Sequence, residues 1–135
     1  MLRRRKRNRK GQSLVETMAG FFILIPLGLF FFDLVTMMTA GQTNEQWAEI
    51  ASRAAATQTS EQMALKSAET AISKCTTTSV IQNVQIEAVK FDTQQGQVSV
   101  STVMTVKLPV PFPYFNQVQL RAAAIEPIVS AQAPW

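Results

Sequence analysis

The chain contains no histidine and a single cysteine, Cys75, among its 135 residues. One cysteine cannot form a disulfide within the chain, and without histidine neither a Cys/His metal site nor a His-based catalytic pair can be built. We therefore expect no enzymatic activity, no metal and no cofactor. Cys75 is expected to be a small packed side chain, and a disulfide to another chain is the alternative.

Acidic residues are missing from the first 15 positions, where seven of the 13 Lys and Arg residues lie between Arg3 and Lys10. From Gly11 onward, the chain has six basic and nine acidic residues, which gives this part a net charge of −3. A basic arm can bind nucleic acid, but such arms usually belong to basic or aromatic-bearing soluble modules. Because this arm runs directly into an apolar segment, we expect no nucleic-acid partner.

Charge of either sign is also missing from Met18 to Phe32, and the apolar character continues to Ala40 with Asp33 as the one interruption. A helix from Thr17 to Ala40 would be about 36 Å long, enough to cross a hydrocarbon core of about 30 Å. We therefore predict a single transmembrane helix in contact with the lipid bilayer.

Two other interpretations of this apolar segment stay open. A buried core helix would need a larger protein around it than the remaining residues supply. A secretory signal peptide has the same order of basic and apolar regions, and its cleavage site would lie near Thr39-Ala40-Gly41.

The charges that flank the segment predict its orientation. The basic run precedes it, and Glu45 and Glu49 follow it. Basic residues are retained on the cytoplasmic side of a membrane, so we expect a cytoplasmic N-terminus and an exported C-terminal part.

A short motif joins the basic run to the apolar segment: Lys10-Gly11-Gln12-Ser13-Leu14-Val15-Glu16. It resembles the processing site of type IV prepilins, which a membrane-embedded prepilin peptidase cuts after the glycine. The resemblance implies that Gln12 becomes the first residue of a mature chain of 124 residues (135 minus 11) and Glu16 the fifth. Gln12 stands where type IVa pilins commonly have phenylalanine.

The order of features is also similar to that of TadE-like pseudopilins of the tight-adherence (Tad, Flp) pilus: a glycine, Val15-Glu16, an early proline at Pro26 and an acid at Asp33. This resemblance covers the first forty residues. It implies a minor pilin or pseudopilin of the bacterial cytoplasmic membrane, or of an extracellular pilus, with other pilin subunits and the pilus assembly machinery as partners. The alternative is a single-pass signal-anchor protein with an exported partner-binding domain that never polymerises.

Three residues of the apolar segment have expected roles. After cleavage, the resemblance implies that Glu16 pairs with the new α-amino group of a neighbouring subunit and sets the axial register between helices. Pro26 lacks a backbone donor and should kink or loosen the helix. Asp33 lies near the outer boundary, where interfacial solvation and a polar contact to a partner helix are the two possibilities.

The rest of the sequence predicts an α+β fold in which the long helix leads to a helical segment and a small antiparallel sheet. We expect a leader over residues 1–11, a transmembrane helix over 12–40, an amphipathic helical segment over 41–75, and a sheet domain with an extended tail over 76–135.

Two apolar stripes are expected in the helical segment, and both are assigned to the domain's own core. The first contains Trp47, Ile50, Ala51 and Ala54, and the second contains Leu65, Ala68, Ile72 and Cys75. Thr59 and Gln62 have the spacing of a capping box at the start of the second helix.

Alternation of apolar and polar residues predicts the strands. Even positions from Val98 to Val110 are apolar or Thr, and a preceding strand from about Val80 to Phe91 has Val84, Ile86 and Ala88 on one face. A turn over 92–96 and a third strand over 118–125 complete the sheet. The proline-rich segment 109–115 is expected to be a rigid extended connector, with a contact site as the alternative.

Overall fold

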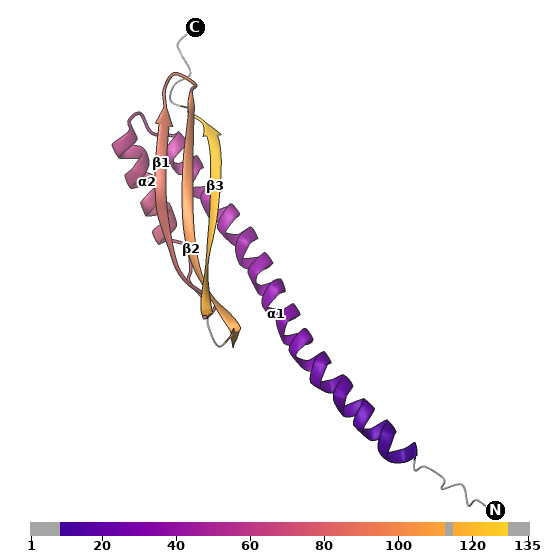
Figure 1. The fold of residues 1–135 in the computed structure, drawn as a ribbon. Helices are drawn as coiled ribbons and strands as arrows, with labels where there is room; N and C mark the ends of the chain where they lie inside the picture. Colours follow the sequence, from indigo (N-terminus) through magenta and orange to yellow (C-terminus); the bar gives the residue numbers. More distant parts are fainter. Residues whose placement is uncertain (1–8, 113–114, 130–135) are drawn as a thin grey trace, which may run out of the picture.

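The computed structural model describes residues 9–112 and 115–129. Its elements are α1 (Arg9–Ala56), α2 (Glu61–Ser73), β1 (Ile81–Asp92), β2 (Gln97–Phe112) and β3 (Phe115–Pro127). The strands form one antiparallel sheet in the order β1-β2-β3. Figure 1 shows the sheet and α2 beside the C-terminal half of α1, while the N-terminal half extends away from them. The predicted α+β fold is confirmed.

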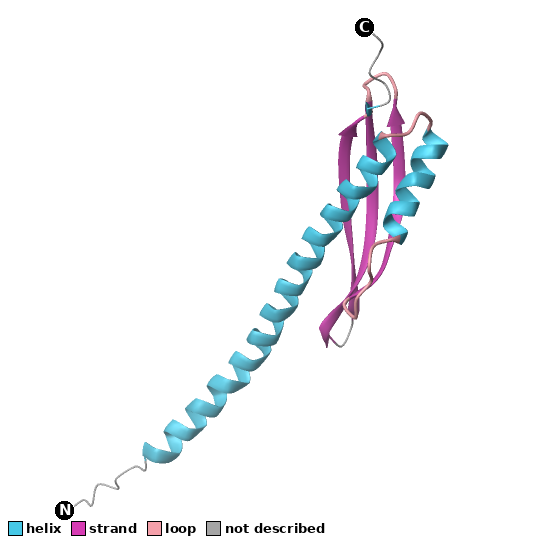
Figure 2. Ribbon diagram, turned by 180° about the vertical axis from the view of Figure 1, so that it is seen from behind, coloured by secondary structure: helices cyan, strands magenta, loops and turns pink. Residues whose placement is uncertain are grey.

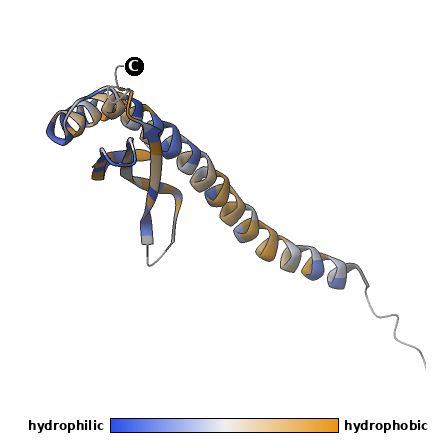
Figure 3. Ribbon diagram, turned by 90° about the horizontal axis from the view of Figure 1, so that it is seen from above, coloured by the Kyte–Doolittle hydropathy of each residue, from blue (hydrophilic) through white to orange (hydrophobic). Residues whose placement is uncertain are grey.

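The helix α1 contains 48 residues and is therefore about 72 Å long. It continues without a break through Pro26 and across position 40, so the apolar segment runs directly into the expected helical segment. Figure 3 shows hydrophobic residues along much of the N-terminal half. One helix therefore forms both the apolar segment and the support of the sheet.

Small side chains allow the C-terminal half of α1 to approach the sheet closely. Four alanines, spaced eight, three and four residues apart in succession, are buried there. They are Ala40, Ala48, Ala51 and Ala55. The opposite surface of this half is polar or exposed, so the helix is amphipathic only where the sheet covers it.

The first expected stripe is partly wrong. Ala51 is fully buried, but Ile50 is 49% exposed. The sheet covers the face that carries Ala48, Ala51 and Ala55, and Ile50 lies one position away from it on the helix. Trp47 is half-buried and packs against both clusters of core residues.

The N-cap of α2 lies one residue later than expected. Ser60, not Thr59, has the extended backbone of an N-cap, and its side chain accepts a hydrogen bond from the backbone N–H of Met63 at 3.4 Å. Of the second stripe, Ala68 and Ile72 are buried, whereas Leu65 is 40% exposed because Ala64 occupies the inward position.

The predicted alternation in β2 is confirmed. Its even residues are buried beneath the helices: Val98, Val100, Thr102, Met104, Val106 and Leu108. The turn before β2 is also confirmed, because the Asp92 carboxylate accepts hydrogen bonds from the backbone N–H groups of Gln94 and Gln95. Gly96 ends the turn with a φ of +66°, a conformation that favours glycine.

The expected face of β1 is wrong at Ala88, which is exposed. The register between β1 and β2 shifts between Ile86 and Ala88, so the alternation moves by one residue. Val89 and Phe91 then pack against the core in place of Ala88.

Two helices cover one face of the sheet (Figure 2): α1 packs against β2 and β3, and α2 packs against β1. The expected connector over 109–115 is strand as far as Phe112 and again from Phe115, with residues 113–114 outside the described part. Residues 130–135 of the expected extended tail also lie outside it.

Candidate functional site

The predicted cleavage position lies in the first turns of α1. Gly11 and Gln12 follow the start of the helix at Arg9. The first turn contains no acidic residue that would stabilise the positive end of the helix dipole.

No contact within the described residues requires glycine at position 11. A Cβ atom there would meet nothing within 4 Å, although a helical glycine costs about 1 kcal/mol relative to alanine. Gly20 and Gly28 are equally open. Any requirement for Gly11 must therefore come from another molecule.

Glu16 is exposed on this half of the helix, and no hydrogen bond or ion pair joins it to any other described residue. Its neighbours Leu14, Val15 and Met18 are all more than 60% exposed. A carboxylate in apolar surroundings is costly unless a positive group or hydrogen-bond donor compensates it.

The surface from Leu14 to Phe32 is almost wholly uncovered. Among the described residues, α1 is the one helix that is long and apolar enough to cross a membrane, and only 6% of its most apolar stretch is buried inside the chain. The core helix of a soluble protein would be mostly covered. This half of α1 is thus a candidate membrane anchor, and Pro26 lies within its exposed surface.

Asp33 is fully buried, which neither of its two expected roles describes. Its Oδ1 atom accepts a hydrogen bond from the backbone N–H of Val110 in β2 at 3.1 Å. Its Oδ2 atom is also buried and has no hydrogen-bond partner among the described residues. The carboxylate therefore attaches the C-terminal end of β2 to α1, at the point where the apolar half of the helix ends.

Asn44 makes a second polar connection, about three turns further along α1. Its Nδ2 atom donates to the carbonyl oxygen of Leu120 in β3 at 3.0 Å, and its Oδ1 atom accepts from the hydroxyl of Thr102 in β2 at 2.9 Å. Both Asn44 and Thr102 are fully buried. One side chain thus connects α1 to two strands.

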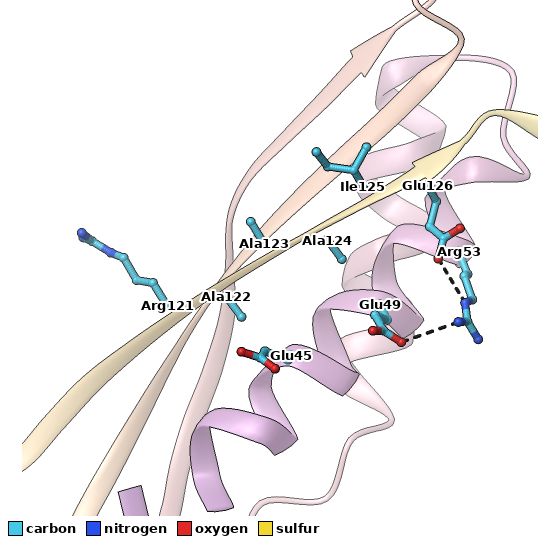
Figure 4. Close-up of a pocket in the computed structure, with 9 residues that line it drawn as sticks. All are labelled: Glu45, Glu49, Arg53, Arg121, Ala122, Ala123, Ala124, Ile125 and Glu126. Carbon is cyan, nitrogen blue, oxygen red and sulfur yellow. Dashed lines mark hydrogen bonds and ion pairs between the residues drawn. The ribbon is translucent and has the colours of Figure 1, made fainter. Parts of the chain in front are cut away.

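Arg53 makes the third connection, near the end of α1. Its guanidinium lies 3.2 Å from the Glu126 carboxylate in β3 and 3.5 Å from Glu49 one turn back (Figure 4). Arg53 and Glu49 are largely exposed, so these pairs contribute at most about 1 kcal/mol each. They position the last turn of α1 beside β3 and add little stability.

Sequence reasoning missed Asn44 and Arg53. A signal was present for Asn44, which lies four residues from both Ala40 and Ala48 on the buried stripe. A polar residue at such a position has to find a partner on another element. No comparable pattern indicated the ion pair between Arg53 and Glu126.

Cys75 is half-buried against the core, as expected for a packed side chain. Burial raises the pKa of its thiol above the ordinary value, which keeps the thiol neutral and weakly nucleophilic. Within the described residues there is no group of three or more His, Cys, Asp or Glu side chains that could hold a metal ion.

The described residues thus bring together two features along one helix: an uncovered apolar half with an isolated carboxylate, and a half joined to the sheet by buried polar contacts. Comparison of the chain with protein-family models, with curated proteins and with solved structures finds no match.

Proposed function

We propose that the chain is a minor pilin or pseudopilin of a Tad-type, type IV-like pilus, a structural subunit that a prepilin peptidase processes after Gly11. The observation that carries the proposal is the uncovered apolar half of α1 with Glu16 near its start. Such a surface needs lipid before assembly and can exchange lipid for the helices of other subunits afterwards.

The position of Glu16 favours a role in packing between helices. It lies four residues after Gln12, so cleavage would place it about 6 Å along the helix from the new α-amino group of its own chain. Its side chain is free of partners in the described chain, and a neighbouring subunit shifted along the helix axis would bring a positive amino group to it. A mispaired register would leave the carboxylate uncompensated in apolar surroundings.

The proposed topology places the sheet outside the cytoplasm and the basic leader inside it. The bacterial cytoplasmic membrane then holds the first half of α1 until assembly. In a filament, the apolar halves would form the interior while the polar faces of the sheets remain in water. The rival function, an anchored protein that never polymerises, uses the same helix without cleavage.

The first test concerns cleavage. We expect mass spectrometry of the chain purified from its native membrane to find Gln12 at the N-terminus, and Gly11→Val to leave the precursor uncut but inserted. Gly20→Val is the matched control, because a Cβ at position 20 also meets nothing and lies outside the motif. A native N-terminus at Met1 or near Gly41 would contradict the proposal.

The second test concerns assembly. Glu16→Gln should be inserted and cleaved normally but should be at least tenfold depleted from sheared filaments and from co-purified pilin subunits, while Glu16→Asp should be partly active. Glu61→Gln is the control, since Glu61 is an exposed acid on α2, away from the apolar half. Normal incorporation of Glu16→Gln would overturn the role of this carboxylate, and absence of the unaltered chain from filaments would favour the anchored, non-polymerising function.

A further inference from the structure

The two edges of the sheet differ in regularity. The pairing of β1 with β2 shifts register twice, between Ile81 and Asn83 and between Ile86 and Ala88. The pairing of β3 with β2 has no shift from Gln97↔Pro127 to Lys107↔Gln117. Bulges protect an edge from pairing with further strands, so over this length β3 presents the straighter, less protected edge.

The hydrogen bonds identify the groups that this edge exposes. The N–H of Lys107 donates to the carbonyl oxygen of Val80, immediately before β1. The backbone N–H and C=O groups of odd residues of β2 therefore point toward β1, and those of even residues point toward β3. The register pairs even residues of β2 with even residues of β3, such as Thr102 with Ala122. The N–H and C=O groups of the odd residues Arg121, Ala123 and Ile125 therefore point away from the sheet.

A groove runs along these exposed groups (Figure 4). It has a volume of about 470 Å³, with Glu45, Glu49 and Arg53 of α1 on one wall and residues 121–126 of β3 on the other. Three of the six strand residues are alanines, which leave their backbone accessible. Arg121 points away from α1, and its guanidinium pairs with Glu87 of β1 at 3.2 Å.

We propose that this groove binds an extended segment of a partner protein as a fourth strand beside β3, with Lys or Arg side chains directed at Glu45 and Glu49. Strand addition satisfies the unpaired backbone groups, and side chains at alternate positions supply specificity. Glu45 makes no ion pair within the described residues, and Glu49 pairs only weakly with Arg53, so the helix wall favours a cationic partner.

A second copy of this chain fits the groove poorly. If its β3 were added, the residues on the side facing α1 would be Leu120, Ala122, Ala124 and Glu126, which include no cation and one acid. Its β1 would present Val84, Ile86, Val89 and Phe91 on that side, again without a cation. The charge of the groove therefore selects a different protein. This inference does not depend on polymerisation or on cleavage after Gly11.

The probe is a synthetic seven-residue peptide in which Lys alternates with Val, and its control replaces each Lys by Glu. Fluorescence anisotropy with the full chain in non-ionic detergent should show that the Lys peptide binds at least tenfold more tightly than the Glu peptide. Amide hydrogen exchange at Ala123 and Ile125 should slow at least tenfold on binding, whereas Ala122 and Ala124, already bonded to β2, should change little.

Two variants separate strand addition from simple charge attraction. Ala123→Pro removes an outward N–H and no bond to β2, so the chain should fold and lose at least tenfold in affinity for the Lys peptide. Glu45→Lys should weaken binding severalfold, and Glu69→Lys, on the exposed surface of α2, should not.

Three outcomes would overturn the proposal: no binding of the Lys peptide, equal binding of the Glu peptide, or binding that leaves exchange at Ala123 and Ile125 unchanged. If Ala123→Pro fails to fold, the exchange measurement and the Glu45→Lys variant still test whether a cationic strand binds beside β3.

Discussion

Asn44 occupies a place in α1 where an apolar side chain would also fill the space against the sheet. A buried amide is stabilising there only because both of its polar atoms have partners, Thr102 and the Leu120 carbonyl. Such a contact specifies which strands face the helix, because any displacement leaves buried polar groups unpaired.

A double-mutant cycle tests the pair formed by Asn44 and Thr102. Asn44→Leu should reduce the free energy of unfolding by about 1–3 kcal/mol, because the Thr102 hydroxyl stays buried without its partner. Thr102→Val should have a similar effect. The double variant should lose less than the sum, as both polar groups are then gone. Urea titration in detergent, followed by Trp47 fluorescence in a Trp135→Phe background, measures this; additive losses would contradict the coupling.

Asp33 allows a different test, since one of its carboxylate oxygens is bonded and the other is buried alone. Asp33→Asn keeps an oxygen to accept from the Val110 N–H, so exchange at the Val110 amide should stay slow. Asp33→Leu removes the acceptor, and exchange there should become at least tenfold faster. Equal exchange rates in the two variants would show that the Asp33 hydrogen bond does not hold this end of β2 to α1.

At the scale of elements, two glycines have opposite expected effects on substitution. Gly96→Ala places a Cβ at a φ of +66° in the β1–β2 turn and should cost about 1 kcal/mol. Gly41→Ala adds a methyl group within α1, where nothing lies within 4 Å, and should stabilise the chain by about 0.5–1 kcal/mol. Urea midpoints of both variants check this, and the same sign for both would contradict the assigned conformations.

Patterns local to one element were predicted well from the sequence. Apolar and polar residues alternate with the same period along the whole of β2, so its buried face could be predicted directly from the sequence. The predicted face of β1 was wrong at Ala88 because the position of a bulge depends on the partner strand. The predicted cap of α2 was wrong by one residue because both Thr59 and Ser60 are suitable N-cap residues.

Contacts between elements were not predictable in the same way. The partners of Asn44 lie 58 and 76 residues away in the sequence, and the partner of Asp33 lies 77 residues away. Spacing along one helix indicates which face is buried, but it does not identify the strand that will cover that face. The candidate positions Gly11, Gln12 and Glu16 stay predictions, because their partners would be other molecules.

At the scale of the whole molecule, the proposed topology has a direct test. A reporter fused after Trp135 should be active outside the cytoplasm, and one fused before Met1 should be active inside, because seven basic residues precede the apolar half of α1. Replacing those seven residues by Gln should weaken this bias. Cytoplasmic activity of the C-terminal fusion would contradict the orientation.

The unbroken helix also fixes how the sheet is oriented relative to the apolar half of α1. Because α1 has no interruption between its apolar half and the Asp33, Asn44 and Arg53 contacts, rotation of the helix turns the sheet through the same angle. One residue inserted between Phe32 and Asp33 would rotate the sheet by about 100° and raise it by about 1.5 Å. In the proposed topology, the neighbours that the apolar half of α1 contacts therefore determine the direction in which the β3 edge points.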